Sequence, residues 1–153
     1  MTDPIVKRQR VNCSAAQAFE VFVSRISAWW PLEEHAASAA DGKAAQAVTF
    51  EPRVGGRLYE TMHDGRINEW GEVLVFEPGR RFATSWHPGN NKDAPTRLEV
   101  EFAEGADGTC EVTLTHSGWE IWADRAEEMR ENYNNGWDFV FGQRFVAGCG
   151  DVE

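Results

Sequence analysis

The central part of the chain alternates between apolar and polar residues in short segments that are separated by turn residues. Six such segments lie between residues 46 and 116, and dipeptides such as Asp64-Gly65 stand between neighbours. Glycine in these dipeptides adopts the positive φ angles that tight hairpins need. A longer polar loop is expected over 87–95. The pattern predicts an antiparallel sheet with strands at 46–51, 56–62, 67–77, 80–87, 96–104 and 109–116.

A long amphipathic stretch follows these strands. Apolar residues recur every three or four positions over 126–141, and charged residues take the opposite face. Asp124, with Glu127 three positions later, has the pattern of a helix N-cap. We expect one helix over about 124–147, with an apolar face that needs a sheet to cover it.

The N-terminal segment adds one strand and one helix. Residues 4–12 alternate as an imperfect strand. Ser14 and Gln17 form a capping-box pattern ahead of an amphipathic helix over 15–26. The order of strand, helix, six strands and long helix predicts an α+β fold, in which a curved antiparallel sheet of seven strands wraps around the C-terminal helix.

Length and charge restrict the classes of function. A chain of 153 residues is one domain by the usual length prior, so we expect a single domain over 1–153. The formal charge of −10 repels phosphate backbones, and we therefore expect neither nucleic acid nor a membrane as partner. The N-terminus lacks the apolar core of a signal peptide, which favours the cytoplasm. Cys13, Cys110 and Cys149 lie far apart in the sequence and predict no disulfide framework.

The sequence matches none of the known motifs for phosphate binding, metal binding or nucleophilic catalysis. The segment FEPRVGGRLYETM, residues 50–62, contains Gly55-Gly56 but neither GxGxxG nor GxxxxGK[ST], and it leads into a strand rather than a helix. We interpret the glycine pair as a corner between strands. The four histidines have no metal-ligand spacing, and no serine or cysteine has the context of a nucleophile. We therefore expect no metal, no cofactor and no assigned catalytic residue.

Two titratable residues fall on the expected inner face of the sheet. Glu60 lies two positions after Leu58, and His116 two positions after Leu114, so strand alternation puts each on the same face as an apolar residue. An inward Glu60 would be a buried carboxylate with a raised pKa and a candidate general acid or base. The alternatives are a surface glutamate and a core histidine whose hydrogen bonds are satisfied.

The chain has seven tryptophans, contributed by the helices, the sheet and the turn before the last helix. This distribution predicts an aromatic-lined cavity between sheet and helix, and a bulky core is the alternative. The candidate ligand-binding residues are Trp29, Trp30, Tyr59, Glu60, Trp70, Trp86, His116, Trp119, Met129, Tyr133, Trp137 and Phe141.

Five segments carry a resemblance to a known family. They are AFEVFVSRISAWWP, FEPRVGGRLYE, EWGEVLVFEPGRRFATSW, VEFAEGADGTCEVTLTHSGWE and NYNNGWDFVF, and together they span nearly the whole chain. In this order they resemble the START-like (SRPBCC, helix-grip) superfamily, and within it the activator of heat-shock protein 90 ATPase homologues. The resemblance implies a seven-stranded sheet around a long C-terminal helix with a cavity between them. Members bind hydrophobic molecules, act as polyketide cyclases, or activate a chaperone in the stress response.

Three functions follow as hypotheses. The first is non-catalytic binding of a small hydrophobic or aromatic ligand. The second is a cyclase-like or hydrolytic enzyme that uses Glu60 or His116 as general base. The third is a chaperone-activating or regulatory module, for which Trp122 should lie exposed in an apolar patch. The sequence leaves open whether the protein is a monomer or a homodimer.

Overall fold

A seven-stranded antiparallel sheet forms the body of the protein in a computed structural model, which describes residues 3–35, 37–87 and 95–150. The strand order is β1-β7-β6-β5-β4-β3-β2. Residues 88–94, most of the loop expected over 87–95, lie outside the described residues. The strands are β1 (Ile5–Val11), β2 (Ala47–Phe50), β3 (Arg57–Thr61), β4 (Ile67–Glu77), β5 (Arg81–Trp86), β6 (Thr96–Glu104) and β7 (Cys110–Ser117).

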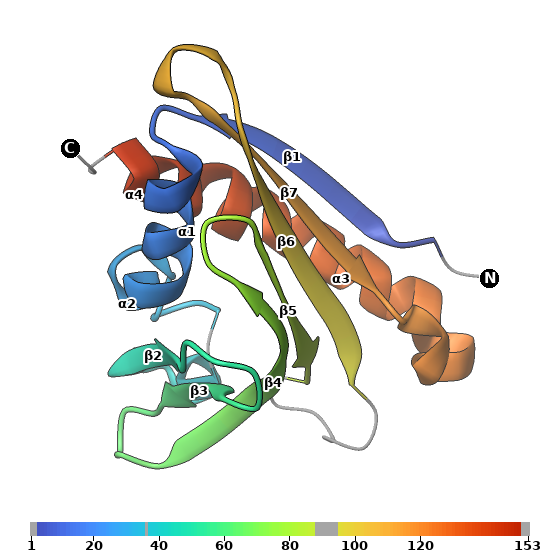
Figure 1. Ribbon diagram of the computed structural model, residues 1–153. Coiled ribbons are helices and arrows are strands. Elements are labelled where there is room, and N and C mark those ends of the chain that lie inside the picture. The colour runs from blue at the N-terminus through green and yellow to red at the C-terminus, as the bar shows by residue number, and fades with distance from the viewer. Residues whose placement is uncertain (1–2, 36, 88–94, 151–153) are drawn as a thin grey trace.

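The helices lie on one side of this curved sheet. Figure 1 shows β1, β7 and β6 running along the C-terminal helix, while β2 and β3 turn away at the other edge. The helical segments are α1 (Ala15–Ser24), α2 (Ile26–Trp29), η1 (Ala37–Asp41), η2 (Ala106–Gly108), η3 (Trp119–Arg125), α3 (Ala126–Phe139), η4 (Val140–Phe145) and α4 (Val146–Gly150). The predicted α+β helix-grip fold, with seven strands around a long C-terminal helix, is confirmed.

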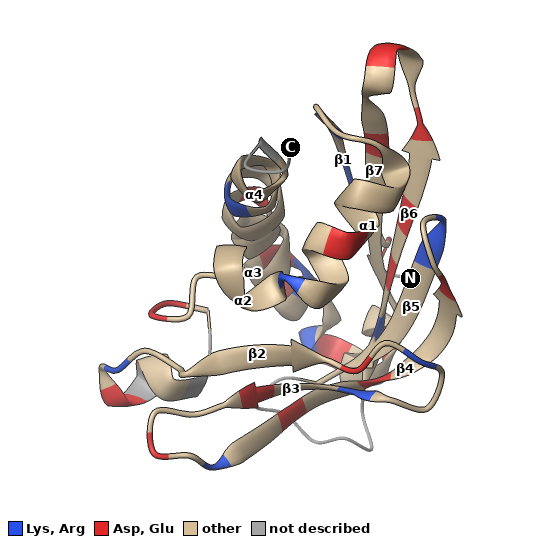
Figure 2. Cartoon of the chain, turned by 60° about the vertical axis from the view of Figure 1, so that its left-hand side comes forward, with Lys and Arg blue, Asp and Glu red and all other residues tan. Residues whose placement is uncertain are grey.

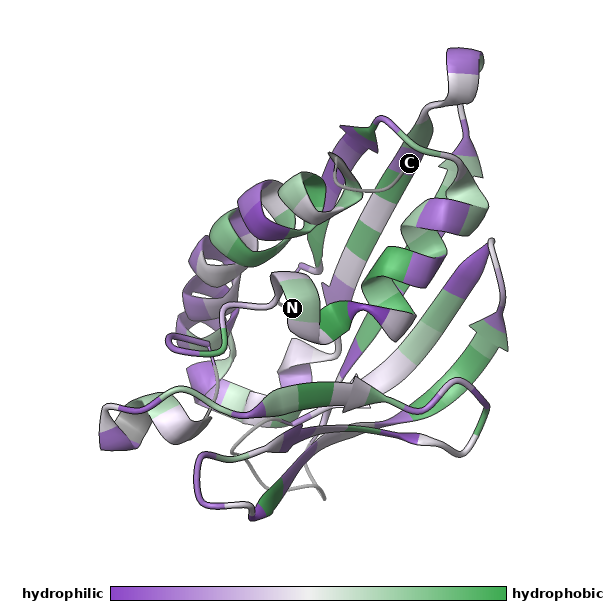
Figure 3. Ribbon diagram, turned by 90° about the vertical axis from the view of Figure 1, so that its left-hand side faces the viewer, coloured by the Kyte–Doolittle hydropathy of each residue, from purple (hydrophilic) through white to green (hydrophobic). Residues whose placement is uncertain are grey.

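The helix α1 begins as its sequence predicts. The Ser14 hydroxyl accepts from the Gln17 amide N–H at 3.1 Å, and the Ser14 amide N–H donates to Gln17 Oε1 at 3.0 Å. This capping box satisfies two amide groups that a helix start would leave unpaired. The apolar face of α1 turns toward the sheet, and Figure 3 shows hydrophobic residues on the facing strands.

The C-terminal helix differs from the single regular helix predicted over 124–147. A 3₁₀ segment, η3, precedes α3, and Ala123 kinks it with φ 52°. Arg125 rather than Asp124 occupies the N-cap position, and no side chain caps it. The π-helical segment η4 interrupts the helix after Phe139 and buries Val140, Phe141 and Phe145. Hydrophobic spacing predicts where a helix lies but carries no signal for one extra residue in a turn.

The glycine pair at residues 55 and 56 forms the predicted corner. Gly55 has φ 84°, and its N–H donates to the Val73 carbonyl at 2.9 Å. The Gly56 N–H donates to the Arg53 carbonyl at 3.0 Å. The Arg57 N–H donates to Glu51 Oε1 at 2.7 Å. All three amide groups therefore have protein acceptors, and the corner has no cradle of amides for a phosphate.

A β-bulge at Trp70 bends the sheet. Leu58 pairs with Gly71 and Tyr59 with Glu69, so Trp70 is the extra residue of β4. A Cβ atom on Gly71 would lie 1.8 Å from the Ser85 carbonyl oxygen. The strand β5 therefore passes so close to the bulge that only glycine fits there.

We expect Gly71→Ala to unfold the protein or to lower its free energy of unfolding by about 3 kcal/mol or more, because backbone would have to move. The matched control is Gly136→Ala in α3, where an added Cβ would lie 3.6 Å from the ring of His35, an ordinary contact. That substitution should stabilise the protein by about 0.5–1 kcal/mol through helix propensity. Urea denaturation measures both changes, and equal effects would contradict the close approach at Gly71.

Candidate functional site

The aromatic core has two halves of different composition. Under α1 it consists of phenylalanines: Phe19, Phe22, Phe50, Phe76, Phe82, Phe102 and Phe145, with ring centroids 4.9–6.4 Å apart. Near α3 four indole rings meet, with centroids 4.9–6.2 Å apart. We call these four, Trp30, Trp70, Trp86 and Trp137, the tryptophan cluster. Trp29 joins the halves, because its ring contacts Phe22, Trp30 and Phe145.

Buried His116 lies at one end of the tryptophan cluster and makes a hydrogen bond through each ring nitrogen. Trp137 Nε1–H donates to His116 Nδ1 at 3.0 Å. Since an indole N–H can only donate, the proton of the neutral imidazole is on Nε2, which donates to Thr96 Oγ1 at 2.6 Å. The Thr96 hydroxyl then donates to the Trp86 carbonyl at 3.1 Å. This chain of hydrogen bonds joins α3 to β7, β6 and β5.

The environment holds His116 neutral. Burial lowers the pKa of His116 to about 3, because the charged imidazolium loses its hydration. The ring of Trp119 lies 4.3 Å from the imidazole, and Tyr133 covers another side at 5.1 Å. In this arrangement both ring nitrogens are occupied, as in a core histidine with satisfied hydrogen bonds.

Glu60 lies at the opposite end of the cluster and is fully buried. Its Oε1 accepts from Trp70 Nε1 and from Asn68 Nδ2, each at 3.2 Å. Its Oε2 accepts from the Ser38 amide N–H at 3.1 Å. The alternation of β3 thus turns Leu58 and Glu60 inward, and the hydrogen bonds compensate for the loss of hydration of the carboxylate.

The structure brings most of the candidate residues together, with three qualifications. Tyr59 lies on the opposite face of β3 from Glu60, under the Arg57 guanidinium at 5.1 Å, so its placement in the cavity wall is wrong. Met129 is only partly buried at the edge of the core. Phe141 is buried but stacks on Phe145 at 5.5 Å, toward the phenylalanine half.

Trp122 is partly buried against the core rather than fully exposed, and the Arg125 guanidinium lies over its ring at 5.9 Å. Its neighbour Ile121 is 44% exposed. The exposed apolar surface at this corner is therefore smaller than the third hypothesis predicts.

Sequence reasoning missed several polar partners of the site. Thr96 connects His116 to β5, and Ser38 and Asn68 bind Glu60. Thr84 is fully buried on β5, two residues before Trp86. Strand alternation places Thr84 and Thr96 inward, but their types give no signal of a site because threonine is common in strands.

The three cysteines converge although they are distant in sequence. All are buried and free, and the thiols of Cys13 and Cys149 lie close enough to affect each other's pKa. Burial raises the pKa of the Cys110 thiol to about 11 and raises that of Cys149 as well. These thiols stay protonated and act as small packing residues.

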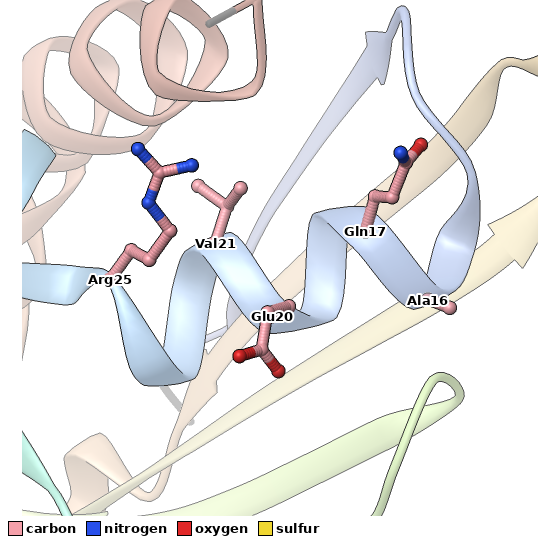
Figure 4. Close-up of a pocket in the computed structure, with 5 residues that line it drawn as sticks. All are labelled: Ala16, Gln17, Glu20, Val21 and Arg25. Atoms are coloured by element: carbon pink, nitrogen blue, oxygen red, sulfur yellow. The ribbon is translucent and has the colours of Figure 1, made fainter. Parts of the chain in front are cut away.

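A shallow groove of about 320 Å³ runs along α1 (Figure 4). Its lining residues are Ala16, Gln17, Glu20, Val21 and Arg25, of which Val21 is buried, so the groove is not confined to the solvent-exposed side of the helix. None is a candidate residue from the sequence, and all belong to one helix and its end, so the groove has no opposing wall of its own.

Three further findings concern charge, metal ligands and helix hydropathy. Acidic positions recur along strands and helices in Figure 2. Within residues 3–35, 37–87 and 95–150, no group of three histidine, cysteine or acidic side chains has the geometry to hold a metal ion. In the same ranges no helix is long and apolar enough to cross a bilayer.

We expect Thr96→Val to lower the free energy of unfolding by about 1–3 kcal/mol, because it leaves His116 Nε2–H unpaired and removes the hydroxyl that donates to the Trp86 carbonyl. Thr84→Val is the matched control. The Thr84 hydroxyl has no hydrogen-bond partner among the described residues. Its removal should be neutral or stabilising by about 1 kcal/mol. Chemical denaturation distinguishes the two, and equal losses would contradict the hydrogen-bond assignment.

The neutral state of His116 predicts a pH dependence of stability. The unfolded chain binds a proton at this residue below pH 6.5, whereas the folded protein does so only near pH 3. The unfolded state therefore holds more protons between these values. The free energy of unfolding should fall as the pH drops through this window, by up to about 1.4 kcal/mol per unit from His116. Urea unfolding between pH 4.5 and 7, the upper part of this window, should give a shallower slope for His116→Gln. Parallel slopes would contradict a neutral buried His116.

Comparisons with known proteins agree with this architecture. The chain is 28% identical to a structure titled an anthrahydroquino-gamma-pyrone synthase, Txn09, with a TM-score of 0.66 over 96% of this chain and 97% of that chain. It also resembles CalC, a self-sacrificing resistance protein from Micromonospora echinospora, at 17% identity with a TM-score of 0.72 over 97% and 95% of the two chains. Protein MLL2253 from Mesorhizobium loti has 15% identity and a TM-score of 0.70 over 98% of both chains. The last two show the fold alone.

The sequence itself decides the family. None of the curated protein sequences matches the chain. The model of the family described as Activator of Hsp90 ATPase homolog 1-like protein matches residues 12–144, which is most of the chain. With the helix-grip architecture in place, we conclude that the chain belongs to the family of Activator of Hsp90 ATPase homolog 1-like proteins.

Proposed function

We propose that this protein binds a planar aromatic small molecule at the tryptophan cluster, without chemical turnover. The observation that carries the proposal is that four indole rings, from the α2 end, β4, β5 and α3, meet between the sheet and α3. Indole rings offer large flat faces that stack on aromatic ligands at low entropic cost. The phenylalanine half lies under α1 and completes an ordinary core.

The packing of α3 supports a route by which the proposed ligand enters. This helix of 14 residues buries only Ala126 and Trp137, whereas α1, with 10 residues, buries six. An element with few buried apolar contacts opens locally at low cost in free energy. A shift of α3 carries the Trp137 indole away from His116 and makes room over Trp30 and Trp86.

The comparison with the synthase supports an aromatic ligand. The name of that protein describes a fused-ring aromatic compound, and its sequence is similar to this chain over almost the full length of both. A flat polycyclic molecule matches the flat surfaces of the tryptophan cluster.

A hydroxylated anthraquinone is a suitable probe for this proposal. It should quench tryptophan fluorescence with a saturable isotherm, lower hydrogen exchange in α3, and be recovered unchanged after incubation. An aliphatic alcohol of similar apolar area is the control and should bind at least about tenfold more weakly, since stacking is lost. Absence of quenching up to the solubility limit, or protection restricted to α1, would sink the proposal.

A cyclase is the second candidate, and the similarity to a synthase together with the buried Glu60 carboxylate favours it. Catalysis by His116 would require that its hydrogen bonds to Trp137 and Thr96 break, so Glu60 is the better base of the two. Mass spectrometry of a poly-β-ketone substrate, incubated with the protein and with Glu60→Gln, tests this candidate. Loss of a cyclised product in the variant, with binding retained, would support it over simple binding.

The family description favours a third candidate, activation of a chaperone ATPase. The half-buried Trp122 and the exposed Ile121 give the surface for it. An Hsp90 ATPase assay with the purified chain tests this role. Stimulation that Ile121→Ser abolishes would support it, and an unchanged rate would remove it.

The proposed location is the cytoplasm, and the three free thiols, which suit a reducing compartment, support it. The oligomeric state stays a prediction of monomer or homodimer.

A further inference from the structure

One indole N–H of the tryptophan cluster differs from the others. The structure buries six tryptophans, and five of their Nε1–H groups have a protein acceptor. Trp86 is 3% exposed, and its Nε1–H has no hydrogen-bond partner among the described residues. An indole nitrogen can only donate, so this group requires an acceptor.

Thr84 provides a second unpaired polar group on the same strand face. Residues two apart on a strand share a face, at a spacing of roughly 7 Å. The Thr84 hydroxyl is fully buried and has no partner in the described part of the chain. The residues that pair with Thr84 across the sheet are Val73 and Leu98, whose side chains cannot hydrogen-bond.

Buried polar groups without partners are uncommon in folded proteins and require an explanation. Elsewhere around the cluster the polar side chains are paired, as Glu60, Thr96 and His116 show. The two unpaired groups, Trp86 Nε1–H and the Thr84 hydroxyl, both lie on the inner face of β5, at the border of the phenylalanine and tryptophan halves. The lack of partners is therefore specific to β5 and is not a general property of the core.

We infer that Trp86 Nε1–H and the Thr84 hydroxyl recognise oxygen atoms of the ligand, so that the ligand is an oxygenated polycyclic aromatic compound such as a hydroxyquinone or an aryl ketone. This inference rests on the proposed function. Trp86 donates to a ligand carbonyl or phenolate oxygen. Thr84 donates to a second oxygen or accepts from a phenol. A bare aromatic hydrocarbon would leave both groups unpaired and would bind more weakly.

The test compares a dihydroxyanthraquinone with anthracene, which has the same ring frame without oxygen. The wild-type protein should bind the quinone about tenfold or more tightly than anthracene. Trp86→Phe and Thr84→Val should each lower the preference for the quinone over anthracene by about five- to tenfold, although Trp86→Phe also removes stacking area for both compounds. Calorimetry or ligand absorbance measures binding without dependence on the tryptophan signal.

The matched control is Trp29→Phe, which removes an indole N–H that donates to the Val21 carbonyl outside the tryptophan cluster. It should lower stability but keep the preference for the quinone. If neither compound binds the wild-type protein, the proposed function fails. If both bind, and the preference for the quinone is absent or survives in Trp86→Phe and Thr84→Val, the inference is overturned and the proposed function stands.

Discussion

The hydrogen-bond chain from Trp137 through His116 and Thr96 to the Trp86 carbonyl connects the C-terminal helix to the interior of the sheet. All four residues are buried, so water cannot easily replace a lost hydrogen bond, and each link depends on its neighbour. The direction of the chain fixes the tautomer of His116. Because α3 buries so few residues, this chain is one of a small number of contacts that hold the helix over the tryptophan cluster, together with the Lys7–Asp138 ion pair.

The two halves of the core differ in the polar groups that they contain. Phenylalanines under α1 provide dispersion and burial without polar groups, which is the usual requirement of a stable core. Tryptophans near α3 bring N–H groups that need acceptors. For all of the buried ones except Trp86, these acceptors are Glu60, His116 and backbone carbonyls. The tryptophan half needs a hydrogen-bond acceptor for each N–H group, and it lies under α3, the helix that buries few residues. For both reasons it is the more suitable place for a ligand.

Much of the fold and of the candidate site follows from the sequence. Alternation and turn residues predict the strands, and the position of Glu60 two residues after apolar Leu58 predicts that its side chain points inward. The sequence does not predict the π-helical segment η4 or the uncapped start of α3, because the spacing of apolar residues indicates only which face of a helix is buried. The aromatic type of Tyr59 suggests the inner wall, but the alternation of β3 puts its side chain on the opposite face from Glu60. The pairing of His116 with Thr96 and Trp137 depends on strand register and helix position, which no local pattern encodes.

The indole N–H resonances of the seven tryptophans provide the most direct test, since each reports on one position. In a titration with a dihydroxyanthraquinone followed by ¹⁵N-correlated NMR, we expect shifts for Trp30, Trp70, Trp86 and Trp137, with the largest at Trp86. Trp122 should be unchanged, because it lies at the η3 corner rather than in the cluster. Shifts confined to Trp122, or none at saturating ligand, would contradict a binding site between the sheet and α3.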